Sequence, residues 1–227
     1  MQLVIANKNY SSWSMRPWVL LRHFGIAFQE TKLRFDRAGQ PSAFKQQVLQ
    51  LSPAGKVPAL IEDDGFLVWD SLAIAEYLAD RHPQLPLWPR DARQRARARA
   101  MCAEMHSGFT ALRSNCPMNI EAALPEVGAR VLREQPGVAT DLARIVTLWS
   151  EALAASGGPF LFGEFGIVDA YYAPVVARLR TYGLPVPAPV QRYMDAVWAS
   201  PGVAAWVADA LAEHDFIEED EPYRQRP

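Results

Sequence analysis

Cysteine is scarce in this chain of 227 residues. Only Cys102 and Cys116 occur, and they are too few and too closely spaced for a secreted disulfide framework or a structural zinc site. We therefore expect a reducing, cytoplasmic location and no bound metal. The 23 basic and 25 acidic residues leave a net charge of −2, which builds no strong positive field. Nucleic acid and anionic membranes are accordingly not expected as partners.

Long apolar stretches are also absent. No uninterrupted run of about 18 apolar residues occurs, so no transmembrane helix is expected. Residues 1–8 contain no basic segment followed by a long apolar stretch, so no signal peptide is expected. Lysine is absent after Lys56, and all later basic side chains apart from histidine are arginine. This shift in composition indicates two parts of different character.

A segment with three prolines separates the two parts. Pro83, Pro86 and Pro89 stand close together, and prolines at this spacing stop a helix and favour extended backbone. We therefore predict a linker over residues 82–90. It divides the chain into an N-terminal domain, residues 1–81, and a C-terminal domain, residues 91–227.

The first part alternates between strand and helix patterns. Residues 3–6 are apolar, residues 18–24 have helical spacing closed by a glycine, and residues 28–35 alternate. Residues 57–68 are typical of a β-hairpin with its turn at Asp64-Gly65, and a helical pattern follows. The order β-α-β followed by β-β-α predicts a small mixed sheet with flanking helices, which is an α/β domain.

The second part carries helical propensity and few strand patterns. Five stretches are rich in alanine, arginine and leucine: residues 91–109, 138–155, 168–182, 189–198 and 203–213. We therefore predict an all-α domain. The charged tail, residues 213–227, is expected to be bound to the surface or frayed.

Three serines stand between the first strand and the first helix, where residues 9–18 read N-Y-S-S-W-S-M-R-P-W. A helix tolerates proline only in its first turn, so the helix is predicted to begin close to Ser14, or at Pro17 itself because proline disfavours helical geometry at Arg16. Spare N–H and O–H donors at a helix N-terminus stabilise an anion, and they would lower a thiol pKa from about 8.5 toward neutrality. The alternative is that these serines only form a cap and a turn.

Two further loops carry recognition features. A cis Val57–Pro58 bond would leave the Val57 backbone free to pair with an extended peptide, although trans is the commoner isomer at the start of a strand. Asp70 or Ser71 can cap the helix that follows, and Asp70 could also pair with a ligand ammonium group. Together the three loops would recognise a small zwitterionic peptide that carries a thiol.

These motifs resemble the glutathione transferase family across essentially the whole chain, and the serine-rich start is similar to its zeta class and related bacterial serine-type members. The resemblance is carried by residues 11–16, 52–60, 70–78 and 165–170. It implies a thioredoxin-like N-terminal domain that binds glutathione and an all-helical C-terminal domain that covers a second-substrate pocket. It also implies a homodimer.

The resemblance also implies roles for single residues. Ser11 would orient and stabilise the glutathione thiolate, with Ser12 and Ser14 as close alternatives. Backbone groups of Val57 would pair with the cysteinyl unit, and Asp70 would hold the γ-glutamyl end together with Ser71. Lys56 or Gln40 would reach the glycyl carboxylate. The residues expected to bind glutathione are thus Arg16, Gln40, Lys56, Val57, Pro58, Asp70 and Ser71.

Selectivity for the second substrate is expected from Met105, His106, Phe109 and Arg113; packing or ion pairing is the alternative role of each. Trp13 stands where zeta members commonly have cysteine, so chemistry through a protein cysteine is not expected there. No residue clearly matches the arginine by which zeta isomerases hold a dicarboxylate. Arg178 and Arg180 lie near the aligned position, which is closer to Thr181.

The resemblance implies a cytoplasmic glutathione transferase. The enzyme would activate the glutathione thiol as thiolate for attack on a small electrophilic substrate. Three alternatives stay open: a glutathione-dependent isomerase of the maleylacetoacetate type, a peroxidase, and a non-catalytic binding protein with the same fold.

Overall fold

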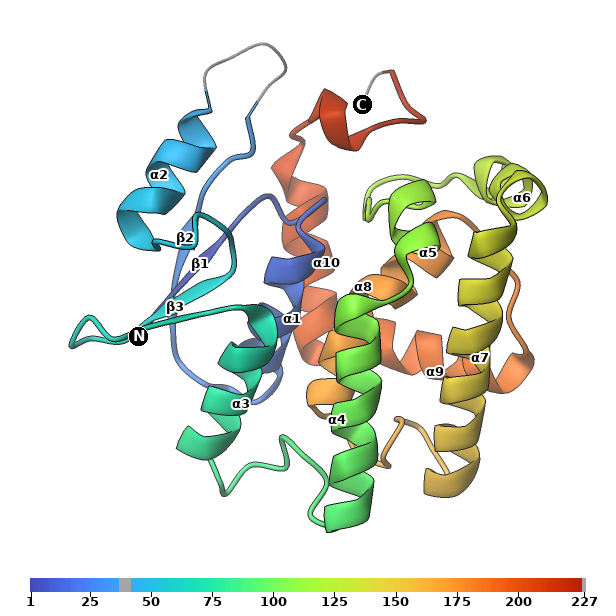
Figure 1. Ribbon diagram of the computed structural model, residues 1–227, viewed down its shortest axis with the longest axis horizontal. Coiled ribbons are helices and arrows are strands. Elements are labelled where there is room, and N and C mark those ends of the chain that lie inside the picture. Colours follow the sequence, from blue (N-terminus) through green and yellow to red (C-terminus); the bar gives the residue numbers. More distant parts are fainter. Residues whose placement is uncertain (37–41, 226–227) are drawn as a thin grey trace.

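The N-terminal part of the protein is a small mixed sheet with helices beside it. A computed structural model describes residues 1–36 and 42–225 (Figure 1). The elements are β1 (Gln2–Ile5), α1 (Ser12–His23), β2 (Gln29–Lys32), α2 (Ala43–Leu51), β3 (Ala59–Ile61), β4 (Leu67–Trp69) and α3 (Ser71–Arg81). The strand order is β2-β1-β3-β4, with β1 parallel to β2 and antiparallel to β3. The predicted mixed sheet and hairpin are confirmed.

Helix α1 begins at Ser12, two residues before the predicted start, so Pro17 lies inside the helix and not in its first turn. Pro17 removes one backbone hydrogen bond near the start of the helix. The packing of α1 outweighs this loss, because Trp18, Val19 and Leu20 are fully or almost fully buried. The sequence patterns also missed α2, whose only buried residue is Val48.

The C-terminal part is helical throughout. Its elements are α4 (Ala92–Ser107), α5 (Thr110–Asn115), α6 (Pro125–Glu134), α7 (Pro136–Ser156), α8 (Ile167–Thr181), α9 (Ala188–Ala199), α10 (Pro201–Glu213) and a short 3₁₀ turn at Glu218–Asp220. The five predicted helical stretches are confirmed, whereas α5 and α6 were not predicted. Within residues 1–36 and 42–225, no helix has both the length and the apolar character that a membrane span requires.

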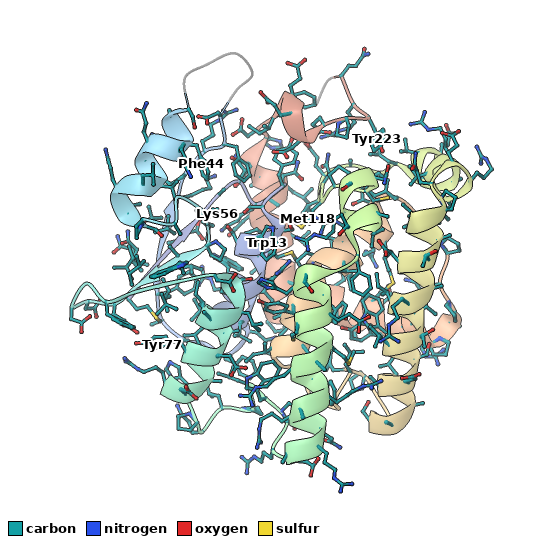
Figure 2. The ribbon with its side chains drawn as sticks, in the orientation of Figure 1. Trp13, Phe44, Lys56, Tyr77, Met118 and Tyr223 are labelled. Atoms are coloured by element: carbon teal, nitrogen blue, oxygen red, sulfur yellow. The ribbon has the colours of Figure 1, made fainter. Side chains whose placement is uncertain are left out.

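The tail that follows α10 returns to the N-terminal part. The hydroxyl of Tyr10, which precedes α1, donates to Glu221 Oε1 over 2.8 Å. Tyr223, labelled in Figure 2, donates through its hydroxyl to the Asn115 carbonyl over 2.7 Å. The described part of the tail is therefore bound to the surface, which is the first of the two states that its sequence predicts.

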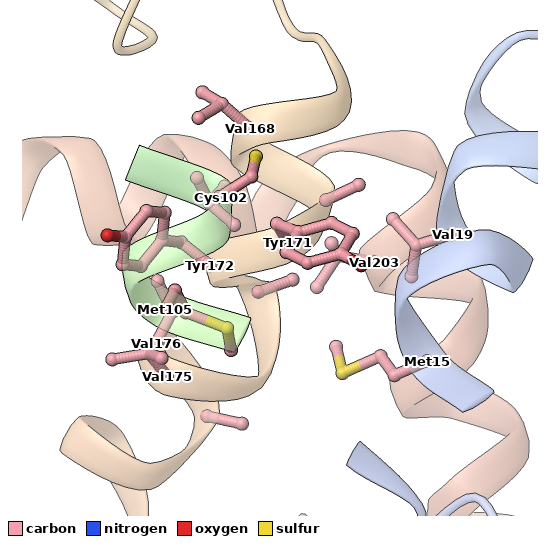
Figure 3. Close-up of a cluster of buried hydrophobic side chains, with 14 of the residues drawn as sticks. Met15, Val19, Cys102, Met105, Val168, Tyr171, Tyr172, Val175, Val176 and Val203 are labelled. Carbon is pink, nitrogen blue, oxygen red and sulfur yellow. The ribbon is translucent and has the colours of Figure 1, made fainter. Parts of the chain in front are cut away.

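Helix α8 connects the two parts of the molecule. Figure 3 shows Tyr171 and Tyr172 of α8 in one buried cluster with Met105 of α4 and Met15 of α1. Figure 1 shows α1 and α10 between the sheet and the other C-terminal helices. The first turn of α1 consequently lies at the junction of sheet and helices.

Candidate active site

A cavity of about 850 Å³ opens at this junction. Figure 2 shows Trp13, Lys56 and Met118 around it, and they come from α1, the loop before β3 and the loop after α5. The structure brings these predicted residues to its wall: Ser11, Ser12, Lys56, Val57, Pro58, Asp70, Ser71, His106 and Arg113. Loops that are far apart in the sequence thus meet in one place.

The three serines differ in what their hydroxyl groups contact. Ser11 donates to Ser14 Oγ over 2.7 Å, and Ser14, which is fully buried, also accepts from the Ala6 N–H over 3.3 Å. Ser12 Oγ accepts from Arg178 Nη2 over 3.4 Å. Since the described residues offer no acceptor to the Ser12 hydrogen, Ser12 is the serine that can donate to a ligand in the cavity.

Backbone donors are also open in the first turn of α1. Met15 N–H donates to the Ser11 carbonyl over 3.1 Å. The N–H groups of Trp13 and Ser14 have no acceptor within the described residues. Unpaired amides at a helix N-terminus, together with the helix dipole, favour an anion.

The loop before β3 presents unpaired backbone. The Val57–Pro58 bond is cis, not the trans isomer that is commoner at such a position. Neither the N–H nor the C=O of Val57 has a hydrogen-bond partner among the residues that the structure describes, and Val57 lines the cavity. Lys56 beside it is exposed. An extended peptide could therefore pair with this segment as an added strand.

Asp70 caps α3 and still presents one oxygen. Its Oδ1 accepts from the Leu72 N–H over 2.7 Å and from the Ala73 N–H over 3.4 Å, so the predicted helix cap is confirmed. Its Oδ2 lies 3.3 Å from His106 Nε2 of α4. Burial lowers the pKa of His106, which favours the neutral imidazole at neutral pH. Asp70 therefore keeps its charge available for a cationic group.

Ser71 is connected to the core and not only to the cavity. Its hydroxyl accepts from Arg16 Nη1 over 3.2 Å and lies 2.9 Å from the Tyr171 hydroxyl. Arg16 is only 1% exposed, its pKa is lowered by burial to about 10, and it does not line the cavity. Its guanidinium lies 3.9 Å from the centre of the Trp13 ring, and that of Arg113 lies 4.7 Å from the same ring. Trp13 thus contacts two cations.

Arg178 of α8 is a site residue that the motifs did not select. It lines the cavity and is 6% exposed, and its pKa is lowered to about 9 by burial and by the charges of Arg113 and Arg16. None of these three arginines forms an ion pair within residues 1–36 and 42–225. The sequence does contain one indication of Arg178, because an arginine stands within the otherwise mostly apolar stretch of residues 167–181. The cavity wall therefore carries two arginines, Arg113 and Arg178, that no carboxylate of the described residues pairs with directly.

Two family models match separate parts of the chain. The family model for the glutathione S-transferase N-terminal domain matches residues 10–81, and the model for the C-terminal domain matches residues 91–209. The chain belongs to the glutathione S-transferase family. This confirms the family that the motifs indicated.

Curated relatives of this transferase include isomerases. A maleylacetoacetate isomerase from Pseudomonas aeruginosa is 30% identical over 99% of this chain and 97% of its own length. A probable maleylacetoacetate isomerase from Caenorhabditis elegans is 35% identical, but the match covers only 44% of each chain. Among solved structures, a glutathione transferase homolog from Burkholderia with bound glutathione has a TM-score of 0.68 at 24% identity, covering 93% of this chain and 98% of the other. This likeness supports the fold.

Several predicted site residues of the transferase lie elsewhere. Met105 of α4 and Phe109, which precedes α5, are buried in the core and do not line the cavity. Ser14 lies behind Ser11, and Gln40 falls outside the described residues. Within residues 1–36 and 42–225, no group of three or more His, Cys, Asp or Glu side chains is placed to hold a metal.

The cavity also contains residues that sequence reasoning missed. Tyr10, Met118 and Asp220 line it. Burial and the neighbouring Glu219 and Glu221 raise the pKa of Asp220 to about 6. Tyr10 lies within the serine-rich segment but was not selected there, and no local motif marks Met118 or Asp220, which come from the loop after α5 and from the tail.

Proposed function

We propose that this protein binds glutathione in the cavity, holds its sulfur as a thiolate at the first turn of α1, and joins the glutathionyl group through that sulfur to a small electrophile. The observation that carries the proposal is the first turn of α1, where the Ser12 hydroxyl and two backbone amides have no acceptor among the described residues. The glutathione bound to the Burkholderia neighbour supports the same ligand.

The free energy supplied by the donors at α1 is large enough to ionise a bound thiol near neutral pH. Each unit of pKa depression requires about 1.36 kcal/mol of preference for the thiolate over the thiol. One hydrogen bond to a charged acceptor supplies about 1.5 to 3 kcal/mol, and the helix dipole adds about 0.3 to 1 kcal/mol. A thiol with an ordinary pKa of about 8.5 is then substantially ionised at neutral pH.

The other loops accommodate the rest of the tripeptide. The free N–H and C=O of Val57 would pair with the cysteinyl backbone. Asp70 Oδ2 would hold the ammonium of the γ-glutamyl unit, while Ser71 would lie beside its carboxylate. Exposed Lys56 would reach the glycyl carboxylate, with Gln40 as an alternative outside the described residues.

The reaction then needs few protein groups. The sulfur loses its proton to solvent, and the thiolate attacks the electrophilic atom, forming a carbon–sulfur bond. The electron pair of the broken bond leaves with the departing group, or stays on the acceptor and takes up a proton. His106 and Arg113, which line the cavity from the helical part of the chain, would contact the electrophile.

Calorimetric titration with glutathione tests the binding step, and Asp70→Asn is the informative variant. We expect the wild type to bind and Asp70→Asn to bind about tenfold more weakly, because a charge-assisted hydrogen bond to the ammonium is lost at a half-exposed site. Asn can still cap α3, so folding should be little changed. Asp80→Asn, on the same helix, serves as the control.

Absence of glutathione binding by the wild type would refute the proposed function. Equal affinity of the wild type and Asp70→Asn would remove Asp70 from the site while leaving the function intact. Binding without turnover of any electrophile would instead favour the non-catalytic alternative.

Glutathione-dependent isomerisation is the second candidate. The Pseudomonas aeruginosa relative is named as such an isomerase, and Arg113 faces the cavity without an acidic partner. The same thiolate would add to a substrate double bond and leave again, so no product would retain glutathione. Assays that follow both loss of free thiol and change of substrate isomer separate the two reactions; peroxide consumption tests the peroxidase alternative.

The proposal retains the remaining parts of the sequence interpretation. These are a domain division into residues 1–81, 82–90 and 91–227, a cytoplasmic location and a homodimer. Phe66, which precedes the edge strand β4, is 55% exposed, and Trp69, the last residue of β4, is 50% exposed. These exposed aromatic side chains support burial of this edge by a second copy of the chain. Light scattering of the purified protein measures the molar mass directly.

A further inference from the structure

Arg178 carries a buried charge with no counter-ion among the described residues. It occupies the last turn of α8 and lines the cavity beside Ser12. The described residues place no carboxylate in an ion pair with it. A buried guanidinium without an anionic partner is unfavourable, so an anion that enters the cavity gains more from Arg178 than an exposed arginine would give.

The donors of Arg178 are only partly used. Nη1 donates to the Pro174 carbonyl over 3.3 Å, and Nη2 donates to Ser12 Oγ over 3.4 Å. Nε is buried and has no partner within the described residues. Because a lone pair of Ser12 Oγ faces Arg178, the hydroxyl hydrogen of Ser12 must point elsewhere.

The groups around Arg178 do not neutralise it. Arg16 of α1 and Arg113 of α5 add positive charge. Burial raises the pKa of Cys116 to about 11 and also raises the pKa of Tyr182, so both are uncharged at neutral pH. The carboxyl groups on the cavity wall, Asp70 and Asp220, form no hydrogen bond or ion pair with Arg178.

We propose that Arg178 is a positioning residue for the glutathione thiolate: it fixes the Ser12 hydroxyl as a donor to the sulfur, and its charge stabilises the sulfur anion. This role rests on the proposed function. Arg178 stays protonated throughout and forms no covalent bond. The S–H bond breaks, its proton leaves to solvent, and the negative charge remains on sulfur between Ser12 and the first turn of α1.

The geometry favours the thiolate over a carboxylate of the second substrate. Arg178 already contacts the serine at the positive end of α1, where the sulfur is proposed to lie. Arg113 instead donates to the His106 carbonyl over 3.1 Å and is close to Trp13, on the side proposed for the electrophile. The two arginines therefore serve different ligands.

The variant Arg178→Met tests this role. We expect the pKa of the bound glutathione thiol, followed by the ultraviolet absorbance of the thiolate against pH, to rise by about one unit or more. The rate below that pKa should fall about tenfold for neutral and carboxylate-bearing electrophiles alike, and the rates of variant and wild type should converge at high pH. Arg178→Lys, which keeps the positive charge, should give a thiol pKa between those of the wild type and Arg178→Met.

Arg180→Met is the matched control. Arg180 lies two residues further along the chain, is exposed, and pairs with Asp195 over 2.9 Å. It should leave the thiol titration unchanged. Because no carboxylate in the described part of the chain pairs with Arg178, its replacement by Met should not lower the melting temperature. Should the Met variant fail to fold, Arg178→Gln, which keeps a donor to Ser12 without the charge, is titrated in its place.

The outcomes are distinct. A wild type that does not depress the thiol pKa overturns the proposed function and this role together. If the wild type lowers the pKa of the bound thiol and Arg178→Met lowers it equally, the role of Arg178 alone is overturned. A loss confined to carboxylate-bearing electrophiles also overturns it, and assigns Arg178 to the second substrate.

Discussion

Replacing Ser12 with alanine should lower the rate of glutathione conjugation below neutral pH by about ten- to a hundredfold. Of the two serines that line the cavity, Ser12 is the one whose hydroxyl hydrogen has no acceptor among the described residues, because Ser11 donates to Ser14. Loss of a hydrogen bond to a charged sulfur removes about 1.5 to 3 kcal/mol, which raises the thiol pKa by about one to two units. Stopped-flow rates measured across pH check this expectation.

The Ser12 hydroxyl determines in which pH range the conjugation rate of the variant falls below that of the wild type. Because Ser12 favours the thiolate, the variant has the higher thiol pKa and a smaller thiolate fraction at every pH below that value. Above both pKa values the thiol is ionised in either protein, and the rates should converge. A rate deficit that persists unchanged at high pH would mean that Ser12 acts on the electrophile or on binding.

Ser11→Ala is the matched control for this prediction. Ser11 donates to buried Ser14, so its loss should lower the free energy of unfolding by about 1 kcal/mol and leave the thiol pKa unchanged. Ser12→Thr keeps a hydroxyl and should retain most of the activity. The reverse result, a raised pKa in Ser11→Ala alone, would return the role to Ser11, as the family resemblance implies.

The sheet and the long helices could be predicted because their patterns are local. The hairpin turn at Asp64-Gly65 is one example, since Gly65 adopts φ of 87°, which glycine reaches without strain. Helix α2 and the short α5 could not be predicted, because α2 buries only Val48 and α5 only Leu112. A helix that buries one side chain leaves little apolar periodicity in the sequence.

The site could be predicted only as far as each loop carries its own pattern. Ser11, Ser12, the Val57-Pro58 pair and Asp70 all reach the cavity. The choice among the serines depends on Arg178, which lies 166 positions from Ser12 in the chain. A contact across that distance leaves no spacing to recognise.

Gly202→Ala should be among the most destabilising single substitutions in the chain. A Cβ at Gly202 in α10 would lie 2.4 Å from the Val19 carbonyl oxygen and 3.1 Å from the His23 nitrogen, both backbone atoms of α1. Alanine gains about 1 kcal/mol over glycine in helix propensity. The clash exceeds this gain because two backbones must separate, and overpacking of this kind typically removes up to about 3 kcal/mol.

Thermal unfolding followed by circular dichroism should show a melting temperature lower by about 4 to 8 °C for a net loss of about 2 kcal/mol. Ala204→Ser is the control, because it also adds one heavy atom to α10 but at an exposed position. It should change the melting temperature only slightly. Because α1 also carries Ser12, a partial displacement of α10 would disturb the thiolate site before the protein unfolds. An unchanged melting temperature together with a raised thiol pKa would indicate that α1 shifts to accommodate the methyl group. The close contact between α10 and α1 would then matter more for the position of Ser12 than for the stability of the fold.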